Sequence, residues 1–511
     1  MKIPPCRLLV LSAIASFCNN WSFAFQITYV NTSVDTFFEM AKRAYRESEG
    51  CVTCKLPESL WLTEWSFMVS SFYPGTIAGF LLVPFMTKWI GVKRTKAVMC
   101  LAASLGIMLH IITPYFLNHG IGVFSTLISL GRLLVGIQAG SSLCLLPLYI
   151  IETSPKEHRH FLNSLQQISQ SFATLLGLVL GSEEIFPLGK FRFTIMQLVA
   201  LLPIVVLFLL LLLTPQTPSY LKTFRPHAGT EAREANEFYY GDDIAYFPLI
   251  QDMKYEKIDR ALSQLSTHTG TLDSSTDWKS SFKGFWIGAV VALSYAFTGD
   301  DLVDTFSSQM LISDDKPPAA HEETDEFTIL ASDAFGVILL LASIVGLFLA
   351  DRYGRRKLVL LGLIGTCIAN FGASFLGKNK FFVAICFSLT KMFIGLGCGG
   401  PAWFITSELV RPEHAWIFQP ISTGLLLGST MLETFFYLQI QEVLGDYSLI
   451  LLAAGPALIA AIVIYLFLPE TQGRTTDEIQ STLHNSTFSG IDKTPRRFEN
   501  MYGSVVNELV Y

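Results

Sequence analysis

The chain has 511 residues, of which 51% are apolar and only 15% are charged, and its mean hydropathy is +0.45. Soluble proteins carry about 25% charged residues, so this composition excludes an ordinary soluble fold. The formal net charge of −6 leaves no basic excess to neutralise phosphates, which argues against binding to nucleic acid. Nine cysteines are too few for a disulfide scaffold in a chain of this length.

The apolar residues are gathered into long runs that are separated by short polar links. A helix needs about 20 apolar residues to cross a bilayer, and the runs have this length. We therefore predict an all-α membrane protein with twelve transmembrane helices in two six-helix halves. The predicted spans are Leu8–Tyr29, Trp65–Thr87, Lys96–Phe116, Ile121–Leu145, Phe161–Gly181, Phe193–Leu213, Phe285–Ser308, Phe327–Ala350, Leu358–Phe375, Phe381–Thr406, Ile417–Leu438 and Leu449–Phe467.

One long polar stretch, Lys222–Lys283, lies between the sixth and seventh spans. Six spans on each side of a central loop are the layout of the major facilitator architecture. We predict an N-terminal half at 1–221, a cytoplasmic linker at 222–284, a C-terminal half at 285–473 and a cytoplasmic tail at 474–511. A short amphipathic helix is expected within the linker, around Ile250–Leu265.

The first apolar run has two interpretations. Lys2 and Arg7 precede it, as basic residues precede the core of a cleaved signal peptide. Hydrophobicity continues through Trp21 and Phe25, however, and no clear cleavage site of small residues follows. A retained span is therefore favoured over a signal peptide.

Lysine and arginine placement predicts the orientation, because cytoplasmic loops carry an excess of both. The basic residues on the side of the central loop are Lys93, Arg94, Lys96, Lys156, Arg159, Arg352, Arg355, Arg356 and Lys357. We expect this side to be cytoplasmic, with both termini, in a multi-pass protein of the plasma membrane. The first outer loop also carries basic residues, but long loops cross membranes largely regardless of charge.

The first outer loop holds two candidate modification sites. Asn31-Thr32-Ser33 matches the glycosylation acceptor pattern on the outer face, close to the membrane. Cys51 and Cys54 are candidates for a local disulfide. No metal site is expected there, because two ligands without a nearby histidine are too few.

Charged motifs mark the cytoplasmic ends of several spans. Asp351–Arg356 (DRYGRR) follows span eight, Pro469–Arg474 (PETQGR) follows span twelve, and Pro147–Arg159 joins spans four and five. Together, and in this order, these motifs resemble the sugar porter family, which comprises the facilitative hexose transporters and their proton-coupled relatives. The resemblance covers nearly the whole chain and implies transport of a small polar solute, a hexose or related sugar, by alternating access.

A tight Gly-centred turn with several cations belongs at the membrane interface. Acid–arginine pairs between bundle ends would hold the cytoplasmic side shut and break as the halves separate. The alternative is that these charges only set the topology. The predicted cytoplasmic gate residues are Glu152, Arg159, Asp351, Arg352, Arg355, Arg356, Glu408, Arg411, Glu470 and Arg474.

The resemblance also implies a substrate site. Gln167 in span five matches the family's sugar-contacting glutamine, and Trp403 in span ten matches the tryptophan that borders the sugar. An amide can hydrogen-bond hydroxyl groups, and an indole ring can pack on a pyranose. Most other polar ligands of the family's hexose site are absent, and their positions fall on Tyr295, Ala296, Leu339, Gly395, Ser422 and Thr423. The predicted substrate contacts are Gln167, Trp403, Asp301, Gln26 and Thr305.

Charges inside membrane spans are rare and costly, and four charged residues lie in spans seven and ten. They are Asp300, Asp301 and Asp304 in span seven and Lys391 in span ten. Asp300 and Asp304 share a helical face, and Asp301 is turned away by about 100°. An uncompensated lysine at mid-depth costs at least about 2.5–3.5 kcal/mol, so Lys391 should have an acidic partner.

An internal repeat relates Lys391 to Arg132. The segment Leu130–Gly140 of span four aligns with Leu389–Gly399 of span ten, and Gln26 of span one aligns with Asp301 of span seven. In proton-coupled sugar porters, an aspartate at the position of Gln26 works with the arginine at the position of Arg132. Here that acid is missing from the first half, and a similar acid–cation pair is expected in the second half.

Three functions stay open on the sequence. The chain is a facilitative uniporter in which Asp301 or Asp300 pairs structurally with Lys391, a proton-coupled or charge-selective carrier that uses this pair, or a non-transporting receptor whose linker and tail engage partners. An enzyme is not expected, because the cytoplasmic linker has no phosphate-binding loop, metal-ligand cluster or nucleophile motif. No cofactor is expected, and the sequence does not predict the oligomeric state.

Overall fold

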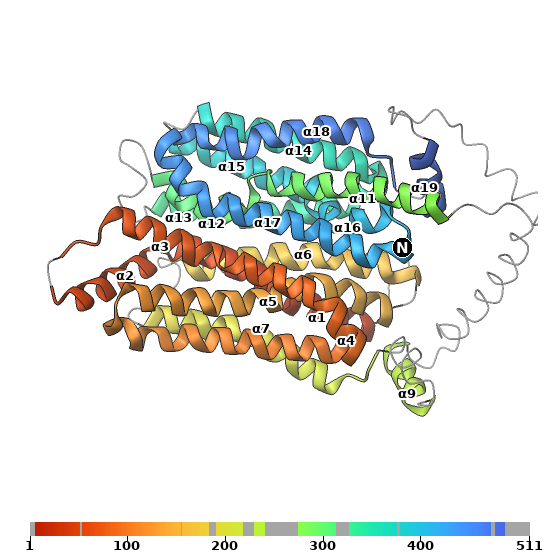
Figure 1. Cartoon of the computed structure of the whole chain (residues 1–511), viewed down its shortest axis with the longest axis horizontal. Coiled ribbons are helices and arrows are strands. Elements are labelled where there is room, and N and C mark those ends of the chain that lie inside the picture. The colour runs from red at the N-terminus through yellow and green to blue at the C-terminus, as the bar shows by residue number, and fades with distance from the viewer. Residues whose placement is uncertain are drawn as a thin grey trace, which may run out of the picture.

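The structure, a computed structural model, describes residues 6–51, 54–154, 156–182, 191–217, 229–240, 274–312, 326–375, 379–471 and 476–485. The described residues form helices, with no β-strand among them. The long helices run side by side along one axis (Figure 1). This arrangement confirms the prediction of an all-α bundle.

The helices of the first half are joined by short segments. They are α1 (Cys6–Thr32), α2 (Val34–Glu49), α3 (Glu58–Ser70), α4 (Phe72–Ile112), the short helix η1 (Thr113–His119), α5 (Ile121–Thr153), α6 (Lys156–Gly181), α7 (Arg192–Leu213) and α9 (Gly229–Tyr240).

The helices of the second half follow in the same way. They are α11 (Ser274–Ala296), α12 (Asp300–Ile312), α13 (Glu326–Tyr353), α14 (Arg355–Phe375), α15 (Lys380–Phe393), the π-helical turn η4 (Ile394–Cys398), α16 (Gly399–Leu409), α17 (Pro412–Leu444), η5 (Gly445–Tyr447), η6 (Ile450–Ala454), α18 (Gly455–Phe467) and α19 (Thr476–Asn485).

Eleven helices or helix pairs in the described part of the chain are long and apolar enough to cross a membrane. They correspond to eleven of the twelve predicted spans. The remaining predicted span lies in α6, whose N-terminal part is polar and lowers its mean hydropathy. Helix α6 nevertheless packs along α1 inside the bundle, where Gly177 and Gly181 lie directly against the side chains of Thr28 and Thr32.

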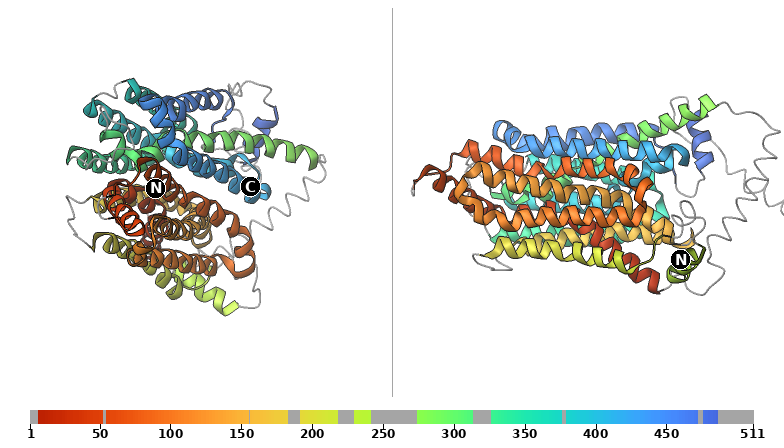
Figure 2. Two further views of the ribbon diagram at one scale, coloured as in Figure 1. Left: turned by 60° about the vertical axis from the view of Figure 1, so that its left-hand side comes forward. Right: turned by 60° about the horizontal axis from the view of Figure 1, so that its bottom comes forward.

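The two halves of the chain form two neighbouring groups of helices. The first half, red to yellow, and the second half, green to blue, lie on opposite sides of the bundle in both orientations (Figures 1 and 2). Helix α2 lies at one end of the bundle, and α9 and α19 lie at the other. We call these ends the α2 end and the α9 end. The first helix starts at the α9 end, so α1 runs toward the α2 end.

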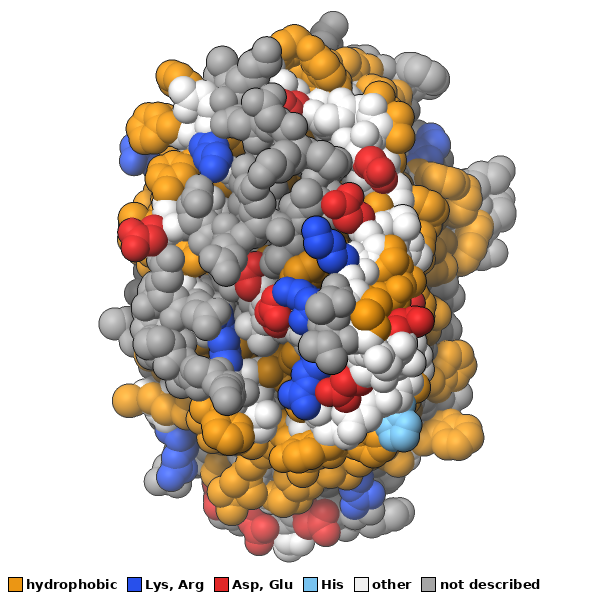
Figure 3. Space-filling model, turned by 90° about the vertical axis from the view of Figure 1, so that its left-hand side faces the viewer, with side chains coloured by type: hydrophobic (Ala, Val, Ile, Leu, Met, Phe, Trp, Pro, Cys, Tyr) orange, Lys and Arg blue, Asp and Glu red, His pale blue; other side chains and the backbone are white. Residues whose placement is uncertain are grey.

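Helix α2 caps its end of the bundle. Its apolar residues recur at helical spacing, and Val34, Phe37, Ala41 and Ala44 are buried while the charged face is exposed. Gly50 ends the helix in the left-handed conformation, with φ of +61°, which a glycine adopts without steric cost. Figure 3 faces this end of the molecule and shows acidic and basic side chains interspersed with hydrophobic ones.

The polar segments differ from the prediction in two places. Helix α9 was not predicted. It packs against α5 through Tyr239, which is buried and whose hydroxyl lies 3.2 Å from that of Tyr149. Helix α11 begins at Ser274, eleven residues before the predicted start of span seven at Phe285. The helix expected around Ile250–Leu265 lies outside the described residues.

Candidate functional site

Span seven is broken at the place where its charged residues begin. Helix α11 ends at Ala296 and α12 starts at Asp300, and Gly299 between them has a φ of +78°. The amide of Asn370 in α14 donates to the carbonyl oxygen of Thr298 at 2.8 Å, which satisfies a backbone group that the break sets free. The break therefore gives α12 an N-terminus inside the membrane, where the helix dipole favours negative charge.

Lys391 of α15 binds two carboxylates of α12. Its side chain is fully buried, and its ammonium forms ion pairs with Asp300 and with Asp304, the latter at 2.6 Å. It also donates to the backbone carbonyl of Asp300 at 3.1 Å. The predicted shared face of Asp300 and Asp304 is thus the face that meets the lysine. Asp301 forms no ion pair with Lys391.

Tyr295 connects this cluster to the middle of the bundle. Its hydroxyl donates to the second carboxylate oxygen of Asp300 at 2.6 Å. Its ring contacts that of Trp403, with centroids 5.8 Å apart, and Trp403 contacts Phe23 of α1 at the same centroid distance. Phe23 belongs to the first half and the other two to the second, so the predicted substrate-contact tryptophan lies at the interface between the halves.

Gln167 reaches the same interface from the first half. It lies on α6, and its side-chain nitrogen is 3.1 Å from the position that a Cβ atom would take on Gly399 of α16. A Cβ atom there would crowd the amide of Gln167, so the glycine permits this close approach. Trp403 lies one turn further along α16 than Gly399. Gln167 of the first half therefore lies against α16, the helix of the second half that carries Trp403.

Span ten is irregular where it lines this interface. The π-helical turn η4 separates α15, which carries Lys391, from α16, which carries Trp403. Such turns are rare and often lie at functional sites. The glycine-rich sequence from Gly397 to Pro401 covers the end of this turn and the start of α16.

Arg132 of α5 is the buried cation of the first half. It donates to the backbone carbonyls of Gln26 at 3.0 Å and Val69 at 3.2 Å, and its guanidinium lies over the ring of Phe72. Its contact with the carbonyl of Gln26 matches the contact of Lys391 with the carbonyl of Asp300. By this geometry, the counterpart of Gln26 is Asp300, one residue before the predicted Asp301.

Asp301 faces a different set of groups. Tyr73 of α4 and Glu433 of α17 are its electrostatic neighbours, and Thr430 of α17 lies beside its carboxylate. Glu433 is only 5% exposed and was missed in the sequence. The sequence could have identified Glu433, because it is an acid inside the predicted span Ile417–Leu438, which is otherwise uncharged.

Two more predicted contacts carry unsatisfied polar atoms. The side-chain amide of Gln26 is buried, and neither its oxygen nor its nitrogen has a hydrogen-bond partner within the described residues. The hydroxyl of Thr305 in α12 is also buried without a hydrogen-bond partner among the described residues. Buried polar groups are normally paired, so these atoms are suited to bind a polar molecule between the halves.

The gate contacts that the structure describes lie within the second half. Arg355 of α14 pairs with Glu408 of α16, and the carboxylate of Glu470 accepts from the backbone N–H of Arg355 at 2.9 Å. All three belong to the second half, so these contacts tie its helices together at the α9 end. Pairs between the halves at this end stay a prediction, because the first-half gate residues Glu152 and Arg159 lie outside the described side chains.

The remaining gate residues are placed only in part. Arg356 donates to the carbonyl of Tyr465 at 2.6 Å, and Arg352 lies over the ring of Tyr353, both within the second half. Arg411 is the residue that precedes α17. The side chains of Glu152, Arg159 and Asp351, and the whole of Arg474, lie outside the described residues.

Asn31 joins the two halves at the α2 end. It lies inside α1 and is 2% exposed. Its amide donates to the hydroxyl of Ser307 at 2.7 Å and accepts from the N–H of Ser308 at 3.0 Å, both in α12. A buried amide with both ends occupied has no access for a glycan. The structure therefore contradicts the prediction of glycosylation at Asn31.

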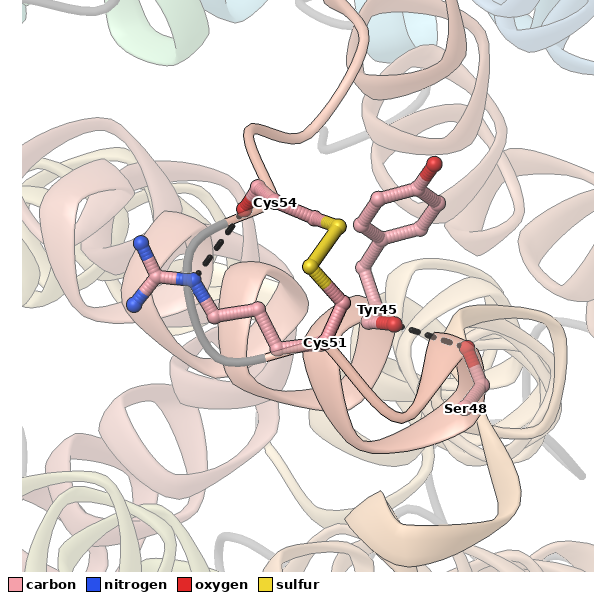
Figure 4. Close-up of a disulfide and its surroundings, with 5 residues drawn as sticks. Tyr45, Ser48, Cys51 and Cys54 are labelled. Carbon is pink, nitrogen blue, oxygen red and sulfur yellow. Dashed lines mark hydrogen bonds between the residues drawn. A yellow bond between two sulfur atoms is a disulfide. The ribbon is translucent and has the colours of Figure 1, made fainter.

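The disulfide considered for the first loop is present. Cys51 and Cys54 are bonded, and Arg46 donates to the carbonyl of Cys54 at 3.2 Å (Figure 4). The hydroxyl of Ser48 donates to the carbonyl of Tyr45 at 2.8 Å in the last turn of α2. The bond closes the segment that follows α2. No cluster of three or more metal-binding side chains occurs within the described ranges.

Known proteins resemble this chain over most of its length. It is 24% identical to the human solute carrier family 2 facilitated glucose transporter member 4 over 498 residues, which cover 94% of this chain and 91% of that protein. It is 28% identical to the rat facilitated glucose transporter member 3 over 447 residues, with 85% of each chain covered. It is 26% identical to the glucose transporter GlcP of Staphylococcus epidermidis over 370 residues, 71% of this chain and 77% of the relative.

The fold matches that of a solved bacterial transporter. The inward open conformation of the xylose transporter XylE from E. coli superposes with a TM-score of 0.71, at 16% sequence identity, and the match covers 93% of this chain and 99% of that one. The sequence pattern of the family described as "Sugar (and other) transporter" matches residues 8–483. The chain therefore belongs to the sugar transporter family of the major facilitator superfamily.

Proposed function

We propose that the protein carries a hexose or a related sugar across the plasma membrane by alternating access, as a facilitative uniporter. The observation that carries this proposal is the position of Gln167 and Trp403 at one interface between the halves, where Gln167 lies against Gly399 and Trp403 lies against Phe23. They come from opposite halves, and a solute held by both would be released when the halves separate. The relatives named above are glucose transporters, which supports a sugar as the solute.

The wall of the site is more aromatic than a standard hexose site. Tyr295 stands where the family places a glutamine, and its hydroxyl is engaged by Asp300. The sugar would therefore rest against the rings of Trp403 and Tyr295 and be oriented by Gln167 and Gln26. The unsatisfied amide of Gln26 supplies both a donor and an acceptor for hydroxyl groups.

The orientation proposed from the sequence has further support. A disulfide forms in oxidising surroundings, and the bond between Cys51 and Cys54 therefore supports an α2 end outside the cell. The arginine-rich turns lie at the α9 end, as expected for a cytoplasmic side. We propose that both termini are cytoplasmic, that residues 1–221 and 285–473 act as the two moving halves, and that residues 222–284 and 474–511 are a linker and a tail.

The outer ends of the halves are in contact in this conformation. Asn31 binds Ser307 and Ser308, and Ser66 of α3 lies 3.3 Å from the amide of Gln439 in α17. These contacts would close the pathway on the outside and would have to break for a solute to enter. The pair between Arg355 and Glu408 would instead keep the second half rigid during the movement.

A second candidate is a proton-coupled or charge-selective carrier. The observation that favours it is the buried cluster of Lys391 with Asp300 and Asp304 beside Tyr295. Movement of the halves that loosened this cluster would change its charge. Coupled transport of a neutral sugar would then produce a current or a dependence on external pH.

Uptake of labelled D-glucose into proteoliposomes, with current measured in parallel, tests the proposal. We expect saturable, electroneutral flux that Gln167→Ala and Trp403→Ala reduce at least tenfold. Trp286→Ala is the matched control, because this tryptophan of α11 is 54% exposed and lies away from the interface. Flux that carries current or follows a pH step would favour the second candidate. Folded protein without any solute flux would favour a receptor.

A further inference from the structure

Two buried carboxylates near the site have no cation of their own among the described residues. Lys391 is already shared by Asp300 and Asp304, and Arg132 is held by the carbonyls of Gln26 and Val69. Asp301 and Glu433 make no ion pair with any described residue, although they are only 7% and 5% exposed. Two ionised acids so deeply buried are strongly unfavourable unless they take up protons or a positive charge joins them.

The groups around Asp301 and Glu433 are oxygen atoms that can accept hydrogen bonds and the aromatic ring of Tyr73. The hydroxyl of Tyr73, one carboxylate oxygen of Glu433 and the hydroxyls of Thr430 and Thr434 are buried, and none makes a hydrogen bond of good geometry within the described residues. Thr430 lies beside Asp301, and Thr434 lies beside the hydroxyl of Tyr73. An ammonium group needs several oxygen acceptors and favours the face of an aromatic ring.

This set of groups spans the two halves. Tyr73 lies on α4 of the first half, whereas Asp301 and Glu433 lie on α12 and α17 of the second. A continuous row of ring contacts joins it to the sugar site, because Trp403 touches Phe23, Phe23 touches Phe72, and Phe72 touches Tyr73. A ligand bound to both acids would thus lie in the same interface as Gln167 and Trp403.

We infer that Asp301 and Glu433 bind the protonated amine of a hydroxylated solute, so that the carried solute is an amino sugar rather than a neutral hexose. This inference rests on the proposed function and names its substrate class. It accounts for two departures from the family at once, since neutral polar ligands for hydroxyl groups are missing and unpaired acids are present. The ring of Tyr73 and its hydroxyl complete the amine site.

A protonated amine fits these groups better than a metal ion. The described residues contain no cluster of three or more acidic, histidine or cysteine side chains that would hold a metal. An alkali cation also prefers a shell of carbonyl and carboxylate oxygens, whereas three of the groups here are hydroxyls that can also donate. A sodium ion is therefore the alternative that the experiment must exclude.

The test is binding to purified full-length protein, measured by thermal stability and by titration calorimetry. The probes are D-glucosamine, its neutral isostere D-glucose, and N-acetyl-D-glucosamine, whose nitrogen carries no charge. All titrations use choline chloride, and one series replaces it with sodium chloride. We expect D-glucosamine to bind at least tenfold more tightly than either neutral sugar.

Variants that keep side-chain shape locate the site. Asp301→Asn and Glu433→Gln should each remove the preference for D-glucosamine and should not lower the melting temperature of the unliganded protein, because each removes an uncompensated charge. Asp333→Asn is the matched control. Asp333 of α13 is a buried acid without a described partner, and it has no contact with this set of groups. Its variant should keep the preference.

Each other outcome overturns the inference in a distinguishable way. Equal affinity for D-glucosamine and D-glucose removes the amine site but leaves sugar transport in place. Stabilisation by sodium chloride that Asp301→Asn and Glu433→Gln abolish assigns the acids to an alkali cation. Loss of the preference in Asp333→Asn as well shows a general effect of buried charge. Binding of none of the three sugars by folded protein overturns the proposed function together with the inference.

Discussion

Lys391 binds both the carboxylate and the backbone carbonyl of Asp300, so a side chain of span ten holds the point where span seven begins again. The lysine satisfies an acid at the N-terminus of α12 and a carbonyl next to the break. Arg132 makes the matching contact with the carbonyl of Gln26 but has no carboxylate there. The two halves thus share a backbone contact and differ in charge.

Replacing Lys391 by methionine should strongly destabilise the protein. The change leaves Asp300 and Asp304 buried without their cation, and the loss of one partner of a buried pair costs about 3–5 kcal/mol. Adding Asp300→Asn should recover a large part of this loss. The measurement is the free energy of unfolding in detergent. Equal recovery by Asp301→Asn, which does not touch Lys391, would contradict the pairing.

Asn31→Ala should open the outer contact between the halves. It removes two buried hydrogen bonds between α1 and α12, each worth about 1–3 kcal/mol when left unmade. Spin labels at the exposed positions Tyr115 and Val443, at the α2 end, should show a larger population of long distances.

The matched control for that opening is Thr32→Ala. The hydroxyl of Thr32 donates to the carbonyl of Leu178, a buried bond that stays within the first half. Loss of this bond should leave the distances between the spin labels unchanged.

The burial of Asn31 also predicts that the wild-type protein carries no glycan there. Digestion with an N-glycosidase should cause no shift in electrophoretic mobility that depends on Asn31, since its amide is buried. A shift that Asn31→Gln removes would refute the placement of α1.

Much of the fold was predictable from the sequence, and the pairing of side chains was less so. Runs of apolar residues define the spans without reference to tertiary contacts, and the helical period places Asp300 and Asp304 on one face. Which acid meets Lys391 depends on how α12 is rotated after the break at Gly299. That rotation follows from contacts with Asn370, which are distant in sequence.

The failures at Asn31 and Glu433 have different causes. Asn31 matches an acceptor pattern, but α1 continues as a helix beyond the predicted end at Tyr29 and buries it. Glu433 was missed because hydropathy is averaged over a whole span, and one acid changes the average of an apolar span only slightly.

Replacing Gly354 and Gly428 by alanine should change the stability of the protein in opposite directions. Gly354 has a φ of +88°, and a Cβ there would meet the carboxylate of Glu470, which accepts from the N–H of Arg355. Gly354→Ala should therefore lower stability by about 1–3 kcal/mol. Gly428→Ala, in the interior of α17 with open space around it, should raise stability by about 0.5–1 kcal/mol. Thermal unfolding of both variants checks the pair, and a stabilising Gly354→Ala would contradict the turn.

The central claim is that the interface between Gln167 and Trp403 carries a sugar through the protein. Counterflow in proteoliposomes preloaded with unlabelled sugar measures this directly, with labelled D-glucose and D-glucosamine outside. We predict saturable accumulation of at least one of them, and Trp403→Ala should abolish it while Trp286→Ala leaves it intact. Accumulation no higher than in protein-free liposomes, with folded wild-type protein present, would contradict the account.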